Sequence, residues 1–352
     1  MSINIFMEHL VPRHLRHQYH LYDRTSKSGI NNICNFPSKV CTVGVEGHCF
    51  LCQCDGWLPI SVGQITDFKK LEDVWQNETA KIIQKDLLEK KFTYCSVDSC
   101  NIKKNNVILN RHFLGLNFDE SCNLACPTCR KSKINITSGR RFDKKMQIAE
   151  HISKLISNFE QSLEIKLSGN GDPFASLIYR HLLSMLKLEG KRIEVELITN
   201  GILAKAHWHK ISGIHKNLIR TKLSFDAGSE TVYNVTRRGG DWNKLIDSTK
   251  FLVQWKQKNY SDMIITANFV VQTANYRDMP LYVDLCDKLG VDEINFQKIV
   301  DWGTFNNFAE HAVWQKTHSE HEFFLNILQS LNNKKINYTN LTDLKHDADA
   351  IS

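Results

Sequence analysis

Three cysteines with the spacing Cys-x3-Cys-x2-Cys directly follow a short apolar stretch: Cys122, Cys126 and Cys129. Thiolates ligate iron–sulfur clusters, and an ordinary four-iron cluster takes four of them. Three thiolates would leave one iron without a protein ligand and open to a small molecule. The alternative is a structural zinc ion, which needs four nitrogen or sulfur ligands, usually as two close pairs. Further ligands would have to come from upstream, from His112 or from Cys95 and Cys100, so the spacing favours the cluster.

The chain from residue 111 onward alternates β-rich runs with amphipathic helical segments. We expect strands at 112–118, 163–168, 193–199, 219–225, 264–271 and 293–298. We expect helices at 144–159, 176–188, 203–212, 241–257 and 277–289. Strands that alternate with helices imply βα units and a parallel sheet. The sequence therefore predicts an α/β fold, a partial (β/α)6 TIM-like barrel.

Polar motifs fall where the expected strands end. The cysteine triplet follows the first strand, and the loop Gly169-Asn170-Gly171-Asp172 follows the second. Polar residues at or near the ends of later strands are Thr199, Asn200, Ser224, Asp226 and Gln297. In β/α barrels the chemistry sits at the C-terminal ends of the strands, so we expect one site on this rim. Taken alone, a glycine pair before Asp-Pro is more often a turn, and Ser-x-Asp often caps a helix.

With these motifs in this order, the chain resembles the radical S-adenosylmethionine (SAM) superfamily. The resemblance implies that the cysteine triplet holds a [4Fe–4S] cluster whose open iron binds SAM. It also implies that the glycine-rich loop binds the SAM amino group and that the later rim residues face its methionine, ribose and adenine. Its implied cofactor-binding residues are Gly169, Asn170, Gly171, Asp172, Thr199, Asn200, Ser224, Asp226 and Gln297. Arg237 and Arg238 could clamp a carboxylate or phosphate, or face solvent.

Residues 1–110 carry seven of the eleven cysteines. Their pattern resembles the SPASM and twitch modules of radical SAM enzymes, which hold auxiliary [4Fe–4S] clusters and usually follow the barrel rather than precede it. The resemblance implies one auxiliary cluster with the ligands Cys34, Cys52, Cys95 and Cys100, and with Cys54 as the substitute for Cys52. A zinc-binding domain with four cysteine ligands is the alternative.

Two further thiols in this block, Cys41 and Cys49, could donate a hydrogen atom to a substrate radical, as an epimerisation would require. More often such a thiol is a small buried apolar residue. The expected domains are the auxiliary module at 1–110, the radical SAM barrel at 111–300, and a C-terminal helical segment with its tail at 301–352.

Composition narrows the class of protein. The chain of 352 residues is 42% hydrophobic and 24% charged, and it has no apolar run long enough to span a membrane and no secretory signal. Many cysteines in a reducing compartment indicate metal binding rather than disulfides, so we predict a soluble, cytoplasmic protein. The formal net charge is +7, but Lys and Arg are scattered, a pattern that does not favour nucleic-acid binding.

We therefore predict an enzyme, an oxidoreductase or an epimerase. The resemblance implies that reductive cleavage of SAM yields a 5′-deoxyadenosyl radical, which removes a hydrogen atom from the substrate. We expect a small polar metabolite, sugar- or nucleotide-like, with electron transfer to the auxiliary cluster and an external reductant of the flavodoxin or ferredoxin type. Few residues precede Cys34, which argues mildly against a peptide substrate. The alternatives are a radical SAM peptide maturase or epimerase and a non-catalytic zinc-binding interaction protein.

Overall fold

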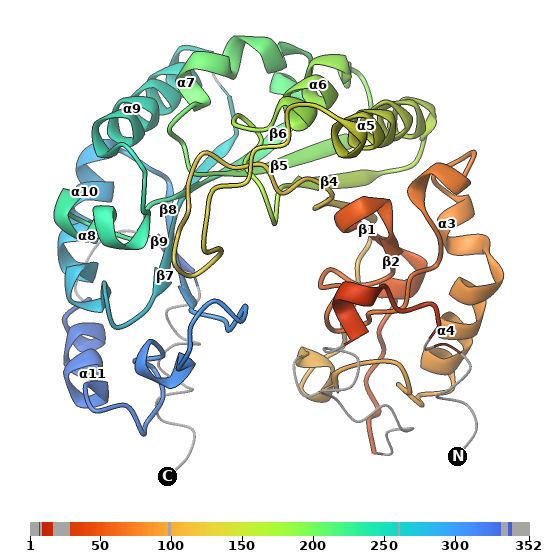
Figure 1. Ribbon diagram of the computed structural model, residues 1–352, viewed down its shortest axis with the longest axis horizontal. Helices are drawn as coiled ribbons and strands as arrows, with labels where there is room; N and C mark the ends of the chain where they lie inside the picture. The colour runs from red at the N-terminus through yellow and green to blue at the C-terminus, as the bar shows by residue number, and fades with distance from the viewer. Residues whose placement is uncertain are drawn as a thin grey trace.

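The computed structural model describes residues 7, 9–16, 29–97, 100–259, 261–331 and 337–339. Over these residues the strands form one nine-stranded sheet in the order β2-β1-β3-β4-β5-β6-β7-β8-β9 (Figure 1). The strands are β1 (Val40–Val43), β2 (Cys49–Phe50), β3 (His112–Leu116), β4 (Leu163–Leu167), β5 (Ile193–Thr199), β6 (Leu218–Ser224), β7 (Ile264–Val271), β8 (Glu293–Lys298) and β9 (Asn337–Thr339). Every neighbouring pair is parallel except β1 and β2.

The helices lie along the outer side of the curved sheet (Figure 1). The α-helices are α3 (Asp73–Gln76), α4 (Glu78–Leu88), α5 (Arg140–Asn158), α6 (Leu177–Met185), α7 (Ala204–His207), α8 (Glu230–Thr236), α9 (Trp242–Lys258), α10 (Met279–Leu289) and α11 (His321–Ser330). Short 3₁₀ helices are η1 (Arg13–Leu15), η2 (Phe36–Ser38), η3 (Val45–Gly47), η4 (Ile65–Asp67), η6 (Asn101–Lys103), η7 (Trp208–Asn217), η8 (Tyr276–Asp278) and η9 (Phe308–Glu310). Among the described residues, no helix is both long and apolar enough to cross a membrane.

The predicted α/β fold with its parallel sheet is confirmed, and β3 to β8 follow the six predicted strand ranges closely. The segment predicted as one helix at 203–212 differs. It forms α7 and then the 3₁₀ helix η7, which kinks at Ile211. A Cβ atom on Gly213 would lie 2.3 Å from the Leu186 carbonyl oxygen. The glycine therefore lets η7 pack directly against the chain that follows α6.

Two strands from the cysteine-rich N-terminal block extend the sheet. β1 pairs in parallel with β3, with Val40 opposite Phe113, and β2 pairs with β1 in the antiparallel sense. The Trp75 indole donates a hydrogen bond to the Val40 carbonyl at 3.0 Å and packs against the His112 ring at a tilt of 47°, with ring centroids 4.6 Å apart. The sheet thus runs across the boundary expected at residue 110.

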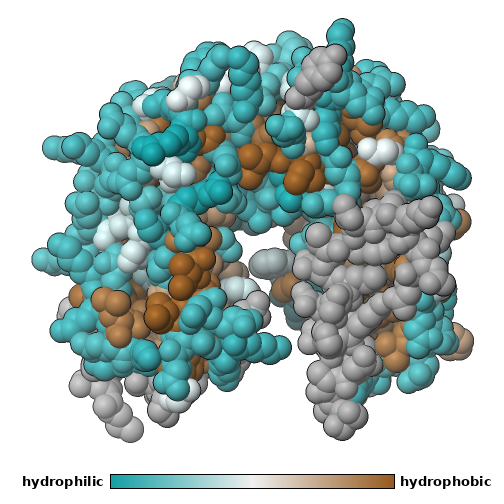
Figure 2. Space-filling model, turned by 180° about the vertical axis from the view of Figure 1, so that it is seen from behind, coloured by the Kyte–Doolittle hydropathy of each residue, from teal (hydrophilic) through white to brown (hydrophobic). Residues whose placement is uncertain are grey.

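The sheet curves into an open arch. In Figure 1 one arm of the arch is the N-terminal block with α3 and α4, and the other arm carries α11. Figure 2 shows the same shape from behind, with a mostly hydrophilic outer surface and open space between the two arms. The barrel is therefore partial, and its inner face is reachable from the open side.

Alternation along the strands gives the sheet one apolar face and one charged face. On β4, Leu163, Ile165 and Leu167 are buried, whereas the intervening Glu164 and Lys166 are partly exposed. Successive strand residues point to opposite faces. Since the apolar set packs into the main core, the charged set faces the inside of the arch.

Candidate active site

The three cysteines of the Cys-x3-Cys-x2-Cys motif lie in the loop after β3 and share one cavity of about 130 Å³ with the loop after β4 and the end of β5. The Cys122 amide donates to the Ile134 carbonyl at 2.8 Å, which closes the loop at its base. The structure brings most of the predicted rim residues to this cavity, namely Gly169, Asn170, Gly171, Asp172, Thr199, Asn200 and Ser224.

Each of the three thiols accepts hydrogen bonds. Cys122 Sγ accepts from the Leu124 amide at 3.4 Å and from Asn200 Nδ2 at 3.7 Å. Arg237 Nη1 donates to Cys126 Sγ at 3.7 Å. Cys129 Sγ accepts from Nε and Nη2 of the adjacent Arg130, at 3.4 and 3.3 Å. These donors favour the thiolate forms that ligate metal.

Two further sets of contacts hold the cysteine loop through its backbone. Arg130 donates to the Glu120 carbonyl at 2.5 Å and to the Asn170 carbonyl in the loop after β4. Arg238 donates to the Ala125 and Lys131 carbonyls, at 3.0 and 3.1 Å. Hydrogen bonds from the guanidinium groups of Arg130 and Arg238 therefore support this loop, whose described residues contain no helix or strand.

Glycine at position 171 is needed for a close backbone approach. A Cβ atom there would lie 2.7 Å from the Asp119 carbonyl oxygen and 2.8 Å from that of Ser121. The Gly171 carbonyl accepts a hydrogen bond from the Ser168 hydroxyl at 2.8 Å. The glycine-rich loop after β4 is thus packed against the loop that carries the cysteines.

Asp172 is buried and its carboxylate holds two loops together. Its Oδ1 accepts from the Phe174 and Ala175 amides, each at 3.0 Å. Its Oδ2 accepts from the Thr199 hydroxyl at 2.7 Å and from the Asn200 amide at 2.8 Å. Burial raises the pKa of Asp172, and these four hydrogen bonds oppose that rise.

This geometry differs from the role that the sequence suggested for Asp172. A carboxylate offers about four lone-pair sites, and all four are occupied by protein donors. The carboxylate therefore has no free acceptor for the amino group of SAM, and the carbonyl groups of the preceding loop remain as the candidates for that contact.

Asp226 is also turned toward the protein. Arg237 Nη2 forms an ion pair with Asp226 Oδ2 at 2.8 Å, and the Val270 amide donates to Oδ1 at 2.7 Å. Asp226 does not line the cavity, although its partner Arg237 does. Gln297, which was expected near the adenine, is exposed on β8 and does not line the cavity either.

The donor set suits an iron–sulfur cluster. Burial raises the pKa of the Cys122 thiol to about 11 and also raises the pKa of Cys126, so metal binding must release their protons. Within the described residues, no three Cys, His, Asp or Glu side chains converge closely enough to hold a single metal ion. A four-iron cluster places each thiolate on a different iron atom, so its ligands need not meet at one point.

The N-terminal block places four cysteines around a second cavity, of about 590 Å³: Cys34, Cys52, Cys95 and Cys100. Burial raises the pKa of each of these four thiols. Cys54 does not line this cavity; burial and the Asp55 charge raise its pKa, and hydrogen bonds from the Gly56 and Trp57 amides oppose that rise. The set that lines the cavity is the one that the resemblance implied.

Cys41 and Cys49 have a different setting. Both side chains are fully buried in the main core, on β1 and β2. Burial and a hydrogen bond with Cys41 raise the pKa of Cys49. Because neither thiol lines the cavity of the three cysteines or the cavity of the N-terminal block, this geometry gives no support to the predicted role as hydrogen donors.

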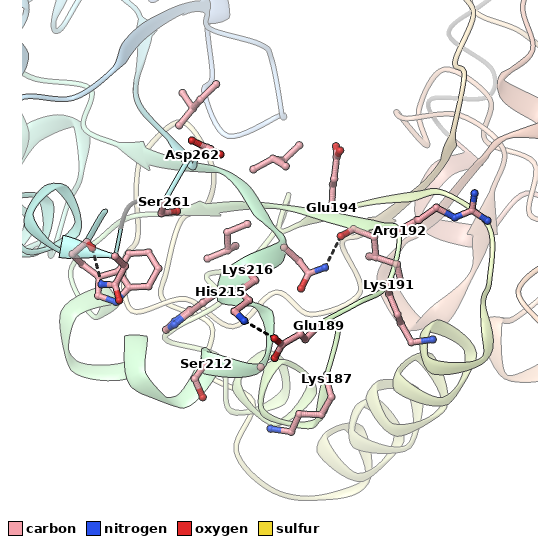
Figure 3. A pocket seen from close by; sticks show the side chains of 18 of the residues that line it. Lys187, Glu189, Lys191, Arg192, Glu194, Ser212, His215, Lys216, Ser261 and Asp262 are labelled. Atoms are coloured by element: carbon pink, nitrogen blue, oxygen red, sulfur yellow. Dashed lines mark hydrogen bonds and ion pairs between the residues drawn. The ribbon is translucent and has the colours of Figure 1, made fainter. Parts of the chain in front are cut away.

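A larger cavity of about 1120 Å³ lies at the opposite end of the barrel, where β5, β6 and β7 begin (Figure 3). Among the charged side chains that line it, Lys216 forms an ion pair with Glu189. His215 stands beside Trp255, with ring centroids 4.7 Å apart. In β/α barrels this N-terminal face serves stability rather than chemistry, and none of the predicted site residues lies there.

Sequence reasoning missed several residues that build the site. Arg130 follows the motif directly, but a single basic residue in a loop carries no signal of its own. Lys145 on α5 is buried and donates from Nζ to the Phe118 carbonyl in the loop after β3. From the sequence, a lysine among polar residues of a helix is expected to be solvent-exposed. Only the three-dimensional structure identifies Lys145 as a buried residue that supports the site.

The family model of the Radical SAM superfamily matches residues 116–279, which run from the end of β3 to the start of α10. No curated protein matches the chain.

Solved structures are similar to the chain at low identity. Streptococcus suis SuiB bound to S-adenosylmethionine is 14% identical, with a TM-score of 0.41 over 62% of this chain and 48% of SuiB. For anSMEcpe with bound AdoMet the identity is 16% and the TM-score 0.40, over 62% and 61% of the two chains. TYW1 with a lysine–pyruvate adduct is 15% identical, with a TM-score of 0.42 over 61% and 70%. The chain spans about half the length of SuiB. The family match over the cysteine loop and the barrel strands identifies residues 116–279 as a Radical SAM domain.

Proposed function

We propose that this protein is a radical SAM enzyme that reductively cleaves SAM and removes a hydrogen atom from a small polar substrate. One observation carries the proposal: three thiols, each with its own hydrogen-bond donor, share a cavity with a glycine-rich loop at the C-terminal rim of the barrel. A protein that only binds zinc or a partner would not need the backbone at Gly171 to pack so closely against the cysteine loop.

In this proposal Cys122, Cys126 and Cys129 hold a [4Fe–4S] cluster, and the backbone from Gly169 to Gly171 lines the SAM site. When bound, the cluster and SAM supply an electron and a 5′-deoxyadenosyl radical. The protein positions both cofactors and limits the access of water. Asp172 keeps the glycine-rich loop in place through its four hydrogen bonds.

The proposal includes one auxiliary [4Fe–4S] cluster in the N-terminal block, held by Cys34, Cys52, Cys95 and Cys100. It is supported by their position around one cavity. Such a cluster would accept an electron from the substrate radical. The proposal includes a cytoplasmic location, because such a cluster requires reduced thiols, and an external flavodoxin- or ferredoxin-type reductant.

The inner face of the sheet supports a polar substrate. Glu196 Oε1 forms ion pairs with Lys166 Nζ at 3.4 Å and with Lys222 Nζ at 3.0 Å. Arg220 forms an ion pair with Glu293. These charges face the inside of the arch. An apolar substrate bound there would remove water from the charged groups without replacing its hydrogen bonds, which costs free energy. A sugar- or nucleotide-like metabolite fits this face best. A peptide is the second candidate, since SuiB also has a structure bound to its precursor peptide SuiA.

The decisive experiment measures iron, sulfide and reductive SAM cleavage in anaerobically purified protein. Wild type should contain about eight iron atoms per chain and release 5′-deoxyadenosine, and Cys122→Ala/Cys126→Ala/Cys129→Ala should keep about four and release none. Zinc in place of iron would favour a non-catalytic binding protein. Iron without SAM cleavage would leave an electron-transfer protein.

A further inference from the structure

Arg237 joins the cysteine loop to a buried carboxylate. Its Nη1 donates to Cys126 Sγ at 3.7 Å, and its Nη2 pairs with Asp226 Oδ2 at 2.8 Å. One guanidinium group therefore contacts a proposed cluster ligand on one side and an anion on the other. Cys126 lies in the loop after β3, Asp226 lies in the loop after β6, and Arg237 directly follows α8.

The pair is shielded from solvent. The Asp226 side chain is 1% exposed and that of Arg237 is 14% exposed. Charges in such a setting are screened by salt far less than surface charges. Their effect on a neighbouring redox centre is correspondingly large.

The backbone at Asp226 is held in an uncommon conformation. Its φ of 56° lies in the left-handed region that side chains other than glycine rarely adopt. The Asn275 side chain donates from Nδ2 to the Asp226 carbonyl at 3.0 Å, and the Val270 backbone amide donates to the Asp226 carboxylate. Such strain persists where the surroundings fix the residue, and it clusters at functional sites. The carboxylate is thus kept facing Arg237.

One nitrogen donor of the Arg237 guanidinium group makes no hydrogen bond among the described residues. Arg237 Nε is buried and has no hydrogen-bond partner among the described residues. The ion pair with Asp226 therefore does not satisfy every N–H group of Arg237. Arg237 as a residue lines the cavity together with Cys126.

The sign of the effect follows from charge. Reduction adds one electron to a cluster, and a nearby cation stabilises the more negative form, whereas a nearby anion destabilises it. Hydrogen bonds to the sulfur atoms and the net local charge are known determinants of cluster potential. Arg237 should raise the reduction potential, and Asp226 should limit that rise.

We propose that Arg237 and Asp226 form a fixed pair that sets the reduction potential of the cluster held by Cys122, Cys126 and Cys129. The inference rests on the proposed function, because it requires that cluster. Both are positioning residues: they act on the cluster through the Cys126 sulfur.

Two neighbouring arginines provide comparisons. Arg238 supports the same loop but donates only to backbone carbonyls, those of Ala125 and Lys131. Its substitution should disturb the loop without changing the charge at a thiol. Arg130 donates to Cys129, but this cysteine is exposed, so solvent weakens its effect.

The test is an anaerobic redox titration of the full-length reconstituted protein without SAM, with dithionite as the one-electron reductant and electron paramagnetic resonance as the readout. Arg237→Met should lower the midpoint of this cluster by 59 mV or more, a tenfold change in the equilibrium constant of a one-electron couple. Asp226→Asn should raise it. Arg237→Lys should stay near wild type, and Arg238→Met should not shift it.

The outcomes separate the two proposals. If wild type binds no iron, the proposed function fails. If wild type holds the cluster and its midpoint is the same in Arg237→Met and Asp226→Asn, this inference is wrong. Weaker SAM binding by Arg237→Met with an unchanged midpoint would also overturn it, because the guanidinium would then serve SAM instead. If Arg237→Met loses the cluster, the midpoint potential of Asp226→Asn still tests the inference, because it is expected to rise above that of wild type.

Discussion

The Thr199 hydroxyl donates a hydrogen bond to Asp172 Oδ2 at 2.7 Å and so ties the last residue of β5 to the loop after β4. The same carboxylate accepts three backbone amides, from Phe174, Ala175 and Asn200. A buried anion with four donors acts as a cross-link between neighbouring loops. The shape of the glycine-rich loop therefore depends on a residue that has no free acceptor for a ligand.

Asp172→Asn should destabilise the protein by about 3 kcal/mol, because an amide cannot accept four hydrogen bonds and would leave buried amides unpaired. Thr199→Val removes one of the four donors and should cost about 1 kcal/mol. Urea unfolding measures both. If Asp172→Asn unfolds like wild type but binds SAM more weakly in equilibrium dialysis, the carboxylate contacts SAM directly and the cross-link is not its main role.

Gly171→Ala should lower stability by about 2 kcal/mol, because its Cβ would lie under 3 Å from two backbone carbonyl oxygens that cannot move independently. It should also weaken SAM binding. Gly169→Ala is the matched control in the same loop, since its Cβ would meet the Asn117 side chain, which can rotate away. Thermal unfolding compares the two variants, and equal losses would show that the close backbone approach at Gly171 is not the cause.

Much of the fold and part of the site could be predicted from the sequence. Strands such as 193–199 and 264–271 carry the β-rich signal of a barrel and match the structure. β1 and β2 were not predicted, because four- and two-residue strands are too short to show a period.

Side-chain roles were harder to predict than positions. The sequence placed Asp172 and Asp226 on the rim, but a carboxylate on a rim can face a ligand or the protein. Their partners are set by tertiary contacts, as for Arg237, which lies 111 residues from Cys126 in the chain. Such long-range pairs leave no local pattern, so the inward orientation of both carboxylates came only from the structure.

The N-terminal cysteines should account for half of the iron. Changing Cys34, Cys52, Cys95 and Cys100 together to Ala should reduce the iron content from about eight to about four atoms per chain and leave the other cluster in place. The double variant Cys41→Ala/Cys49→Ala is the control. These two thiols are buried away from the cavity, so this variant should keep all of its iron. Iron loss in the control, or full iron in the quadruple variant, would contradict the predicted ligand set.

His112 should make the folded protein sensitive to mild acid. It lies on β3, is 8% exposed, and packs between Trp75 and Phe159, with ring centroids 4.6 and 5.4 Å away. Burial, with a smaller effect from the Lys39 charge, lowers the pKa of His112 from 6.5 to about 4. The folded state therefore favours the neutral ring. The stability from this group is fully present above pH 6.5 and is lost as the pH falls toward 4.

The full shift would be worth roughly 3 kcal/mol as an upper limit, at about 1.4 kcal/mol for each pKa unit. Between pH 7 and 4.5 the free energy of unfolding of wild type should thus fall by about 2 kcal/mol more than that of His112→Phe. Phenylalanine keeps an aromatic ring between Trp75 and Phe159 but cannot take up a proton. Urea unfolding at the two pH values measures the difference, and carboxyl groups that titrate in the same range affect both proteins alike. Equal losses would mean that the unfolded and folded proteins protonate His112 over the same range. The site where the N-terminal block packs on the barrel would then contribute nothing to the acid sensitivity of the fold.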